Sequence, residues 1–195
     1  MAVGTYGSYW NSYLPMFFDR MSSLIRKKMT EAVENEGITS AHAVYLIALR
    51  LQDGQTMAEI SHFLDLDQAN THRVMKVLSE KKLVYDDRVS PTSKKFNIML
   101  TQKGRDVADR VMKAVEDYLD NCFKDISEED LFHVRNTLIK VLLRMDPDLE
   151  AYMSSPKWKN PFFVYLAFMP PEEEADYYGM VESRLLNERR NRSKS

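Results

Sequence analysis

The spacing of apolar residues in the first quarter of the chain predicts two helices. From Leu14 to Val33 apolar side chains recur every three or four positions, which places them on one helix face, and Gly37 is a typical helix end. After Thr39 or Ser40 as the cap, the segment AHAVYLIALRL is apolar on nearly every side. We therefore expect the second helix to be central and buried.

Two short helices are predicted next, after a turn at Asp53-Gly54. Thr56 and Glu59 have the spacing of a capping box, in which each side chain accepts a hydrogen bond from a free backbone N–H group. The apolar residues expected to face inward from this helix are Ile60, Phe63 and Leu64. Asp67 then caps the next helix. Two short helices joined by a tight turn, the second polar at its leading end, indicate a helix-turn-helix.

A β-hairpin follows these helices. Residues 82–85 leave the helical pattern, residues 89–93 have the composition of a turn, and apolar residues alternate with polar or flexible neighbours at Phe96, Ile98 and Leu100. The whole pattern predicts a mainly α fold with a small β-hairpin wing, in which a winged helix-turn-helix is flanked by long helices.

Two long helices are predicted after the hairpin. Thr101 caps the first, whose apolar face carries Val107, Val111, Val115, Tyr118 and Cys122. The second begins at Ser127 and stops before Pro147, and its apolar stripe consists of Leu131, Val134, Leu138, Val141, Leu142 and Met145. Because Cys122 lies on an apolar stripe, we expect an inert core thiol rather than a redox switch.

The helix capped by Asp67 has polar residues in its first two turns. Val74, Val77 and Leu78 fix its buried side, with Thr71 one turn earlier. The residues expected to face outward are Gln68, Ala69, His72, Arg73 and Lys76, with Asn70 at the boundary. Arginine can bond guanine bidentately, asparagine or glutamine can bond adenine, alanine can contact a thymine methyl group, and lysine suits phosphate. The ordinary alternative is that any exposed helix is polar.

The distribution of charge favours DNA binding over that alternative. The chain has a net charge of −2, but residues 68–104 contain eight basic and three acidic residues, a net charge of +5. The wing adds the adjacent lysines Lys94 and Lys95, and Thr56 stands at the start of the helix-turn-helix. Together, these features predict a DNA-binding surface.

Other kinds of site are not indicated. The four histidines match no zinc pattern, there is one cysteine, and neither a catalytic nucleophile with its base nor a glycine-rich phosphate loop stands out. We expect no enzyme, no metal and no cofactor. The N-terminus lacks the pattern of a secretion signal, and the apolar run at residues 162–169 is far shorter than the ~20 residues of a spanning helix. We therefore expect a cytoplasmic protein that does not bind membranes.

The order of elements from Leu14 to Met145 resembles that of the MarR family of winged-helix transcription regulators. The residues that carry the resemblance are Thr56-x-x-Glu59-Ile60-Ser61, Asp67, Arg73-Val74, Leu78, Lys82-Leu83-Val84 and Leu100-Thr101-x-Lys103-Gly104. The resemblance implies an obligate homodimer built from the first and the last two helices, a recognition helix in the major groove and wing tips in the minor groove. It also implies a small aromatic or anionic effector that binds between the dimer and DNA-binding regions.

The resemblance divides the chain into four parts. They are an N-terminal dimerisation helix at residues 1–38, the winged helix-turn-helix at 39–104, C-terminal dimerisation helices at 105–146, and an extension at 147–195 outside the family pattern.

The wing departs from the family pattern at two places. Members usually carry Asp-x-Arg or Asp-Arg-Arg in the wing, whereas the aligned residues here are Thr92-Ser93-Lys94, so we expect the internal ion pair of the wing to be missing. Lys82 stands where a glycine usually precedes the first wing strand, and a left-handed conformation there costs ~1 kcal/mol.

The C-terminal extension is acidic and partly apolar. Residues 146–178 contain seven acidic and two basic residues, a net charge of −5, which phosphate repels. The apolar segment Trp158–Met169 is expected to pack on the dimer region, crossing to the partner subunit, or to form a flap on its own subunit.

These observations predict a sequence-specific DNA-binding transcriptional regulator, a repressor relieved by a small-molecule effector. Its partner is a double-stranded, pseudo-palindromic operator whose half-sites lie ~10 bp apart. The alternative is a winged-helix protein-interaction module that has lost DNA binding, which the altered wing leaves open. Salt dependence separates the two, since phosphate binding weakens steeply as salt rises.

Overall fold

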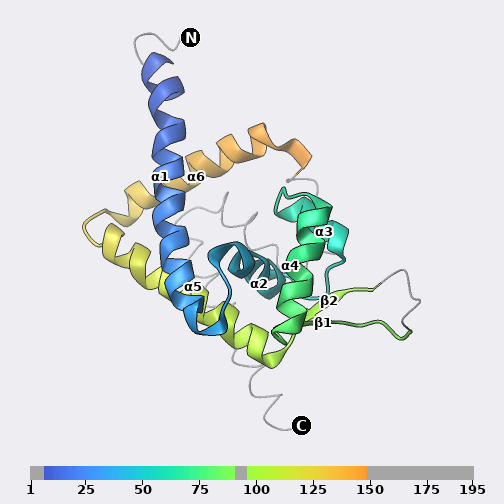
Figure 1. Ribbon diagram of the computed structural model, residues 1–195. Coiled ribbons are helices and arrows are strands. Elements are labelled where there is room, and N and C mark those ends of the chain that lie inside the picture. The colour runs from blue at the N-terminus through green and yellow to red at the C-terminus, as the bar shows by residue number, and fades with distance from the viewer. Residues whose placement is uncertain (1–6, 91–95, 149–195) are drawn as a thin grey trace. The chain divides into compact units, whose positions relative to one another are not determined.

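The computed structural model describes residues 7–90 and 96–148, and the chain divides into two compact units between Lys124 and Asp125. The first unit contains the winged helix-turn-helix (Figure 1). Its elements are α1 (Gly7–Val33), the 3-10 helix η1 (Glu34–Glu36), α2 (Ser40–Leu51), α3 (Met57–Phe63), α4 (Gln68–Glu80), β1 (Val84–Asp86), β2 (Ile98–Leu100) and α5 (Gln102–Phe123). The second unit contains α6 (Glu128–Met145).

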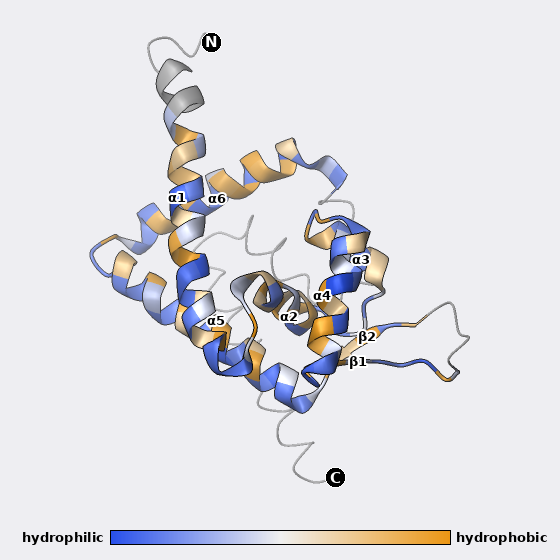
Figure 2. Cartoon of the chain, viewed as in Figure 1, coloured by the Kyte–Doolittle hydropathy of each residue, from blue (hydrophilic) through white to orange (hydrophobic). Residues whose placement is uncertain are grey.

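Side-chain caps define the helix-turn-helix, as the sequence predicts. The Thr56 hydroxyl accepts a hydrogen bond from the Glu59 N–H at 3.2 Å, and a Glu59 carboxylate oxygen accepts one from the Thr56 N–H at 2.8 Å. Asp67 caps α4 in the same way, through the Asn70 N–H at 2.8 Å. The turn between the two helices places Asp65 in the left-handed region, with φ 49°. In Figure 2, α4 carries both hydrophilic and hydrophobic residues, as expected of a helix with one buried side.

The wing is a two-stranded antiparallel hairpin. Val84 lies opposite Leu100 and Asp86 opposite Ile98, and Ile98 also forms a bridge to Gln55 in the loop before α3. Lys82, between α4 and β1, adopts the left-handed conformation, with φ 58°. The left-handed conformation considered for this residue is therefore confirmed, at a cost of ~1 kcal/mol.

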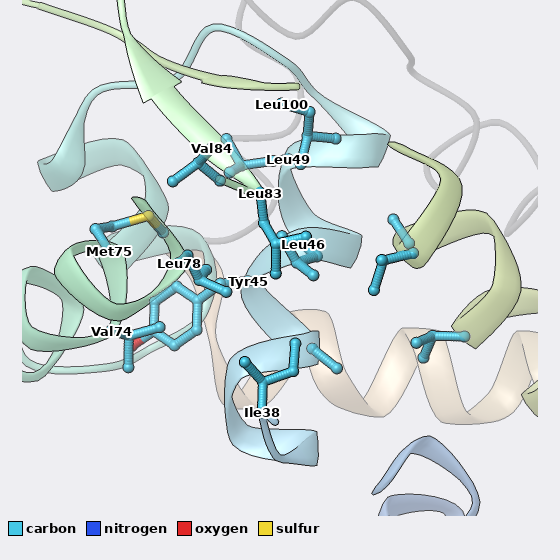
Figure 3. Close-up of a cluster of buried hydrophobic side chains, with 14 of the residues drawn as sticks. Ile38, Tyr45, Leu46, Leu49, Val74, Met75, Leu78, Leu83, Val84 and Leu100 are labelled. Carbon is cyan, nitrogen blue, oxygen red and sulfur yellow. The ribbon is translucent and has the colours of Figure 1, made fainter. Parts of the chain in front are cut away.

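The core is built around α2, which packs against α1, α3, α5 and β2. The α2 side chains of Tyr45, Leu46 and Leu49 are almost completely buried. Figure 3 shows them meeting apolar side chains from α4 and both strands. The prediction of a central, buried helix is confirmed. Burial of side chains of this size stabilises the fold by about 1.5–3 kcal/mol each.

The N-terminal turn of α5 packs tightly against the wing. The Thr101 hydroxyl caps α5 through the Gly104 N–H at 2.9 Å, and the side chains of Val107 and Val111 are buried. One expectation for α5 is wrong, because Cys122 is exposed rather than part of the core. The buried part of the apolar face ends one turn after Val111, where Val115 is only partly buried.

Helix α6 begins at its Ser127 cap, as predicted, and none of its residues is buried. The apolar stripe is exposed, most strongly at Met145, with 79% of its surface accessible. Among the described residues, no helix combines the length and the apolar character that crossing a membrane requires. The segment Trp158–Met169 lies outside the described residues.

Candidate nucleic-acid interface

Helix α4 presents two chemically different sides. Its buried side consists of Thr71, Val74, Met75 and Leu78. Its exposed side consists of Gln68, Ala69, His72, Arg73 and Lys76, and Asn70 lies half-buried between the two. The predicted orientation of these residues is confirmed, and their contact with DNA stays a prediction. The arrangement is suited to a groove, because hydrogen-bonding and cationic groups project from a helix that is anchored by apolar contacts behind it.

The first turn of α4 is held by a small hydrogen-bond network. The Asn70 side-chain amide donates to the Tyr45 hydroxyl at 3.3 Å, and the hydroxyls of Tyr45 and Thr71 lie 3.3 Å apart. The Thr71 hydroxyl donates to the Asp67 carbonyl at 3.1 Å. Asn70 is therefore connected to the core helix α2, whereas its exposed neighbours Gln68 and Arg73 project from the surface.

Thr56 lies at the start of α3, and its hydroxyl is already engaged. It donates to a Glu59 carboxylate oxygen at 2.8 Å while accepting from the Glu59 backbone N–H. A hydroxyl has a single proton, so Thr56 can donate to a phosphate only by releasing Glu59. Its contact with DNA stays a prediction.

The wing contains an internal ion pair, so the expectation that none is present is wrong. The Arg88 guanidinium contacts both carboxylate oxygens of Asp86, at 3.0 and 2.6 Å, and lies 4.2 Å from the centre of the Phe96 ring. The hydrogen bond from Arg88 lowers the pKa of Asp86 below its ordinary value. Thr92-Ser93-Lys94 and Lys95 lie outside the described residues.

Arg88 is the candidate residue that the sequence reasoning missed. Asp86-Asp87-Arg88 itself has the Asp-x-Arg form, six positions before Thr92-Ser93-Lys94. Beside it, Asp87 holds the opposite strand through the Asn97 backbone N–H at 2.7 Å and side-chain amide at 2.8 Å. These bonds lower the pKa of Asp87. The exposed arginine is thus fixed on a braced hairpin.

A second ion pair joins the loop before α3 to α5, and its carboxylate also binds the end of the wing. The Asp53 carboxylate accepts from the Arg105 guanidinium at 2.8 Å and from the Leu100 N–H at 2.9 Å. Asp53 precedes α3, Leu100 ends β2 and Arg105 is in the first turn of α5. This one carboxylate therefore fixes the wing relative to the helix-turn-helix.

Within the described ranges, no group of three or more His, Cys, Asp or Glu side chains could hold a metal ion. His72 is exposed on α4, and His42 lies at the start of α2, where its ring nitrogen is 2.8 Å from the Thr39 hydroxyl. Partial burial lowers the pKa of His42, which favours its neutral form.

Comparison with known proteins identifies the architecture. No protein-family model and no curated protein matches the sequence. A MarR-family transcriptional regulator from Silicibacter pomeroyi matches the structure with a TM-score of 0.59 at 22% identity, over 69% of this chain and 90% of that one. This chain has the MarR fold.

Two further structures with the MarR fold were solved with bound molecules. MepR from S. aureus, in a complex with DNA, matches with a TM-score of 0.56 at 23% identity, over 67% of this chain and 94% of that one. CouR from Rhodococcus jostii RHA1, bound to p-coumaroyl-CoA, matches with a TM-score of 0.56 at 18% identity, over 67% of this chain and 92% of that one. At these identities the likeness concerns the fold.

Proposed function

We propose that the protein is a sequence-specific DNA-binding transcriptional regulator that inserts α4 into the major groove. The observation that carries this proposal is the exposed polar side of α4, capped by Asp67 and anchored from behind by buried residues. The likeness to MepR, whose structure contains DNA, supports the same reading. A capped helix with its leading turns exposed is the arrangement by which helix-turn-helix proteins reach base edges.

Each exposed residue of α4 has a role that follows from its chemistry. Arg73 bonds guanine through its guanidinium, Gln68 bonds adenine through its amide, and Ala69 contacts a thymine methyl group. Lys76, one turn further along, binds phosphate and positions the helix without reading sequence. His72, Asn70 and Thr56 complete this surface.

The wing provides the second contact in this proposal. Arg88, Lys94 and Lys95 bring positive charge to the hairpin, and the minor groove attracts inserted arginine and lysine side chains. The ion pair with Asp86 keeps Arg88 oriented at the start of the loop before DNA is bound. The aspartate also offsets part of the arginine charge, so the lysines carry more of the phosphate attraction.

The regulator acts as a homodimer on a pseudo-palindromic operator. Apolar side chains are exposed on α6 at Val134, Leu138, Val141, Leu142 and Met145, and on α1 at Met16, Phe17, Phe18 and Leu24. Exposed apolar surfaces of this kind favour burial in an interface between subunits. A dimer presents two α4 helices, which fits half-sites about one helical turn, ~10 bp, apart. Packing of Trp158–Met169 on this region belongs to the same proposal.

Repression by operator occlusion, relieved by a small aromatic or anionic effector, completes the proposed mechanism. The support is the bound p-coumaroyl-CoA of CouR, a ligand with an aromatic and an anionic part. The effector binds more tightly to a dimer whose two α4 helices do not match the operator spacing. The difference between its affinities for the matching and non-matching states sets how far it shifts the dimer off the operator.

The test is binding of the purified protein to the DNA that flanks its own gene. Arg73→Ala is expected to weaken binding by about five-fold or more, because a bidentate arginine contact to guanine is worth about 1–3 kcal/mol. Arg26→Ala is the matched control, since Arg26 is exposed on α1 and its removal should leave the affinity unchanged. If wild type and Arg73→Ala bind equally weakly and without sequence preference, the protein is the interaction module that has lost DNA binding.

A further inference from the structure

The hydrogen bonds behind Asn70 form a series in which each group donates to the next. They run from the Asn70 amide to the Tyr45 hydroxyl at 3.3 Å, from there to the Thr71 hydroxyl at 3.3 Å, and on to the Asp67 carbonyl at 3.1 Å. Tyr45 and Thr71 are buried, with 1% and 0% of their surfaces accessible. The hydrogen-bond series therefore starts at a half-buried residue of α4 and passes through groups that have little access to water.

The position of each proton in this hydrogen-bond series follows from its last acceptor, the Asp67 carbonyl. A backbone carbonyl only accepts, so the single hydroxyl proton of Thr71 points to Asp67. Thr71 must then accept from Tyr45, which uses the single proton of the tyrosine hydroxyl. The tyrosine oxygen can only accept from its remaining neighbour, so it is the NH₂ group of Asn70 that faces Tyr45.

We propose that Tyr45 is a positioning residue that fixes the amide of Asn70 for reading adenine. This inference rests on the proposed function. One amide N–H is held by Tyr45, which leaves the carbonyl oxygen and the second N–H as an acceptor and a donor side by side. The major-groove edge of adenine offers the complementary pair, its N6 amino group and its N7. A rotated amide presents the reverse order and does not match adenine.

The surroundings of Tyr45 keep this geometry in place. Its ring extends from α2 toward Val74 and Leu78 of α4, as Figure 3 shows, and both of these side chains are buried. The Asp67 carboxylate holds the backbone N–H of Asn70 at 2.8 Å. Both the backbone and the side chain of Asn70 are therefore oriented before DNA arrives, which reduces the entropy lost on binding.

The experiment is selection of binding sites from random-sequence DNA by the full chain, compared among variants. Wild type is expected to prefer adenine by roughly ten-fold at one position in each half-site, a preference that Asn70→Ala abolishes. Tyr45→Phe, which removes only the hydroxyl, should abolish the preference at the same position and leave the others intact. The double variant should lose no more than either single one, because the two residues act through one contact.

Two controls separate positioning from a general effect on the fold. Tyr118→Phe removes a tyrosine hydroxyl from α5 and should leave every base preference unchanged. Thr71→Val takes away the acceptor of Tyr45, which frees the tyrosine proton to turn toward Asn70. The adenine preference should then be lost with Tyr45 still present. This variant therefore tests the hydrogen-bond series even where Tyr45→Phe does not fold.

The outcomes are distinguishable. If wild type selects no sequence, the proposed function itself fails. If wild type selects a site but Tyr45→Phe and Thr71→Val both keep its adenine preference, the positioning role is wrong. A uniform loss of affinity at all positions in these variants also contradicts it, since that result indicates a structural role alone.

Discussion

At the scale of single residues, the wing shows why sequence spacing can mislead. The family pattern places an Asp-x-Arg motif at Thr92-Ser93-Lys94, where this chain has none. The ion pair of the wing instead joins Asp86, the last residue of β1, to Arg88. The loop of a hairpin varies in length among related proteins. A motif beside a strand can therefore keep its place in the structure while its position in the sequence shifts.

The Asp86–Arg88 pair predicts a pH dependence. The pKa of Asp86 is lowered from its ordinary value of 3.8 by the Arg88 hydrogen bond, so the pair stabilises the folded wing fully above that value. The contribution is lost as the pH falls below 3.8 through the folded-state pKa. NMR titration of the Asp86 carboxyl should give a midpoint below 3.8, and Arg88→Ala should move it upward. A midpoint at or above the ordinary value contradicts the pairing.

Gly104 supplies a prediction about packing. A Cβ atom added there would lie 2.0 Å from the Leu83 carbonyl oxygen, which is a backbone atom and cannot move aside cheaply. Gly104→Ala is therefore expected to lower the free energy of unfolding by about 3 kcal/mol or more. Gln102→Ala, at an exposed position of the same turn, should change it by less than ~0.5 kcal/mol. Chemical denaturation measures both, and equal stabilities of the two variants are incompatible with the close approach.

At the scale of elements, the sequence predicted most of the fold because helix ends are encoded locally. Thr56, Asp67, Thr101 and Ser127 each accept a backbone hydrogen bond as an N-cap, at the positions their spacing indicated. The exposure of Cys122 was not predictable in this way. Periodicity shows which side chains share a helix face, but only the packing of other elements decides where along that face the core ends.

The cap of α4 can be tested directly. Asp67→Ala removes the acceptor of the Asn70 N–H and is expected to cost about 1 kcal/mol of stability. Because the same bond orients Asn70, affinity for the operator should fall as well. Asp120→Ala, at an exposed position of α5, is the matched control and should leave both quantities unchanged. Unchanged stability in Asp67→Ala would show that the cap contributes nothing to α4.

At the scale of the whole molecule, the exposed apolar stripe of α6 carries the prediction of a dimer. Leu142→Glu places a charge within that stripe and is expected to convert the dimer to monomers, as measured by sedimentation. Operator affinity should fall strongly with it, since one subunit reaches only one half-site. Lys140→Glu is the control, because Lys140 is an exposed polar residue of the same helix. A Leu142→Glu protein that stays dimeric contradicts this interface.

Sequence-specific recognition of DNA by α4 can be measured as the affinity of wild-type protein for its operator and for a scrambled sequence over a series of salt concentrations. We expect the logarithm of both affinities to fall linearly with the logarithm of salt, and the operator to be preferred by about 10³-fold or more. Equal affinity for the two sequences, or binding that does not respond to salt, would mean that α4 does not read DNA sequence.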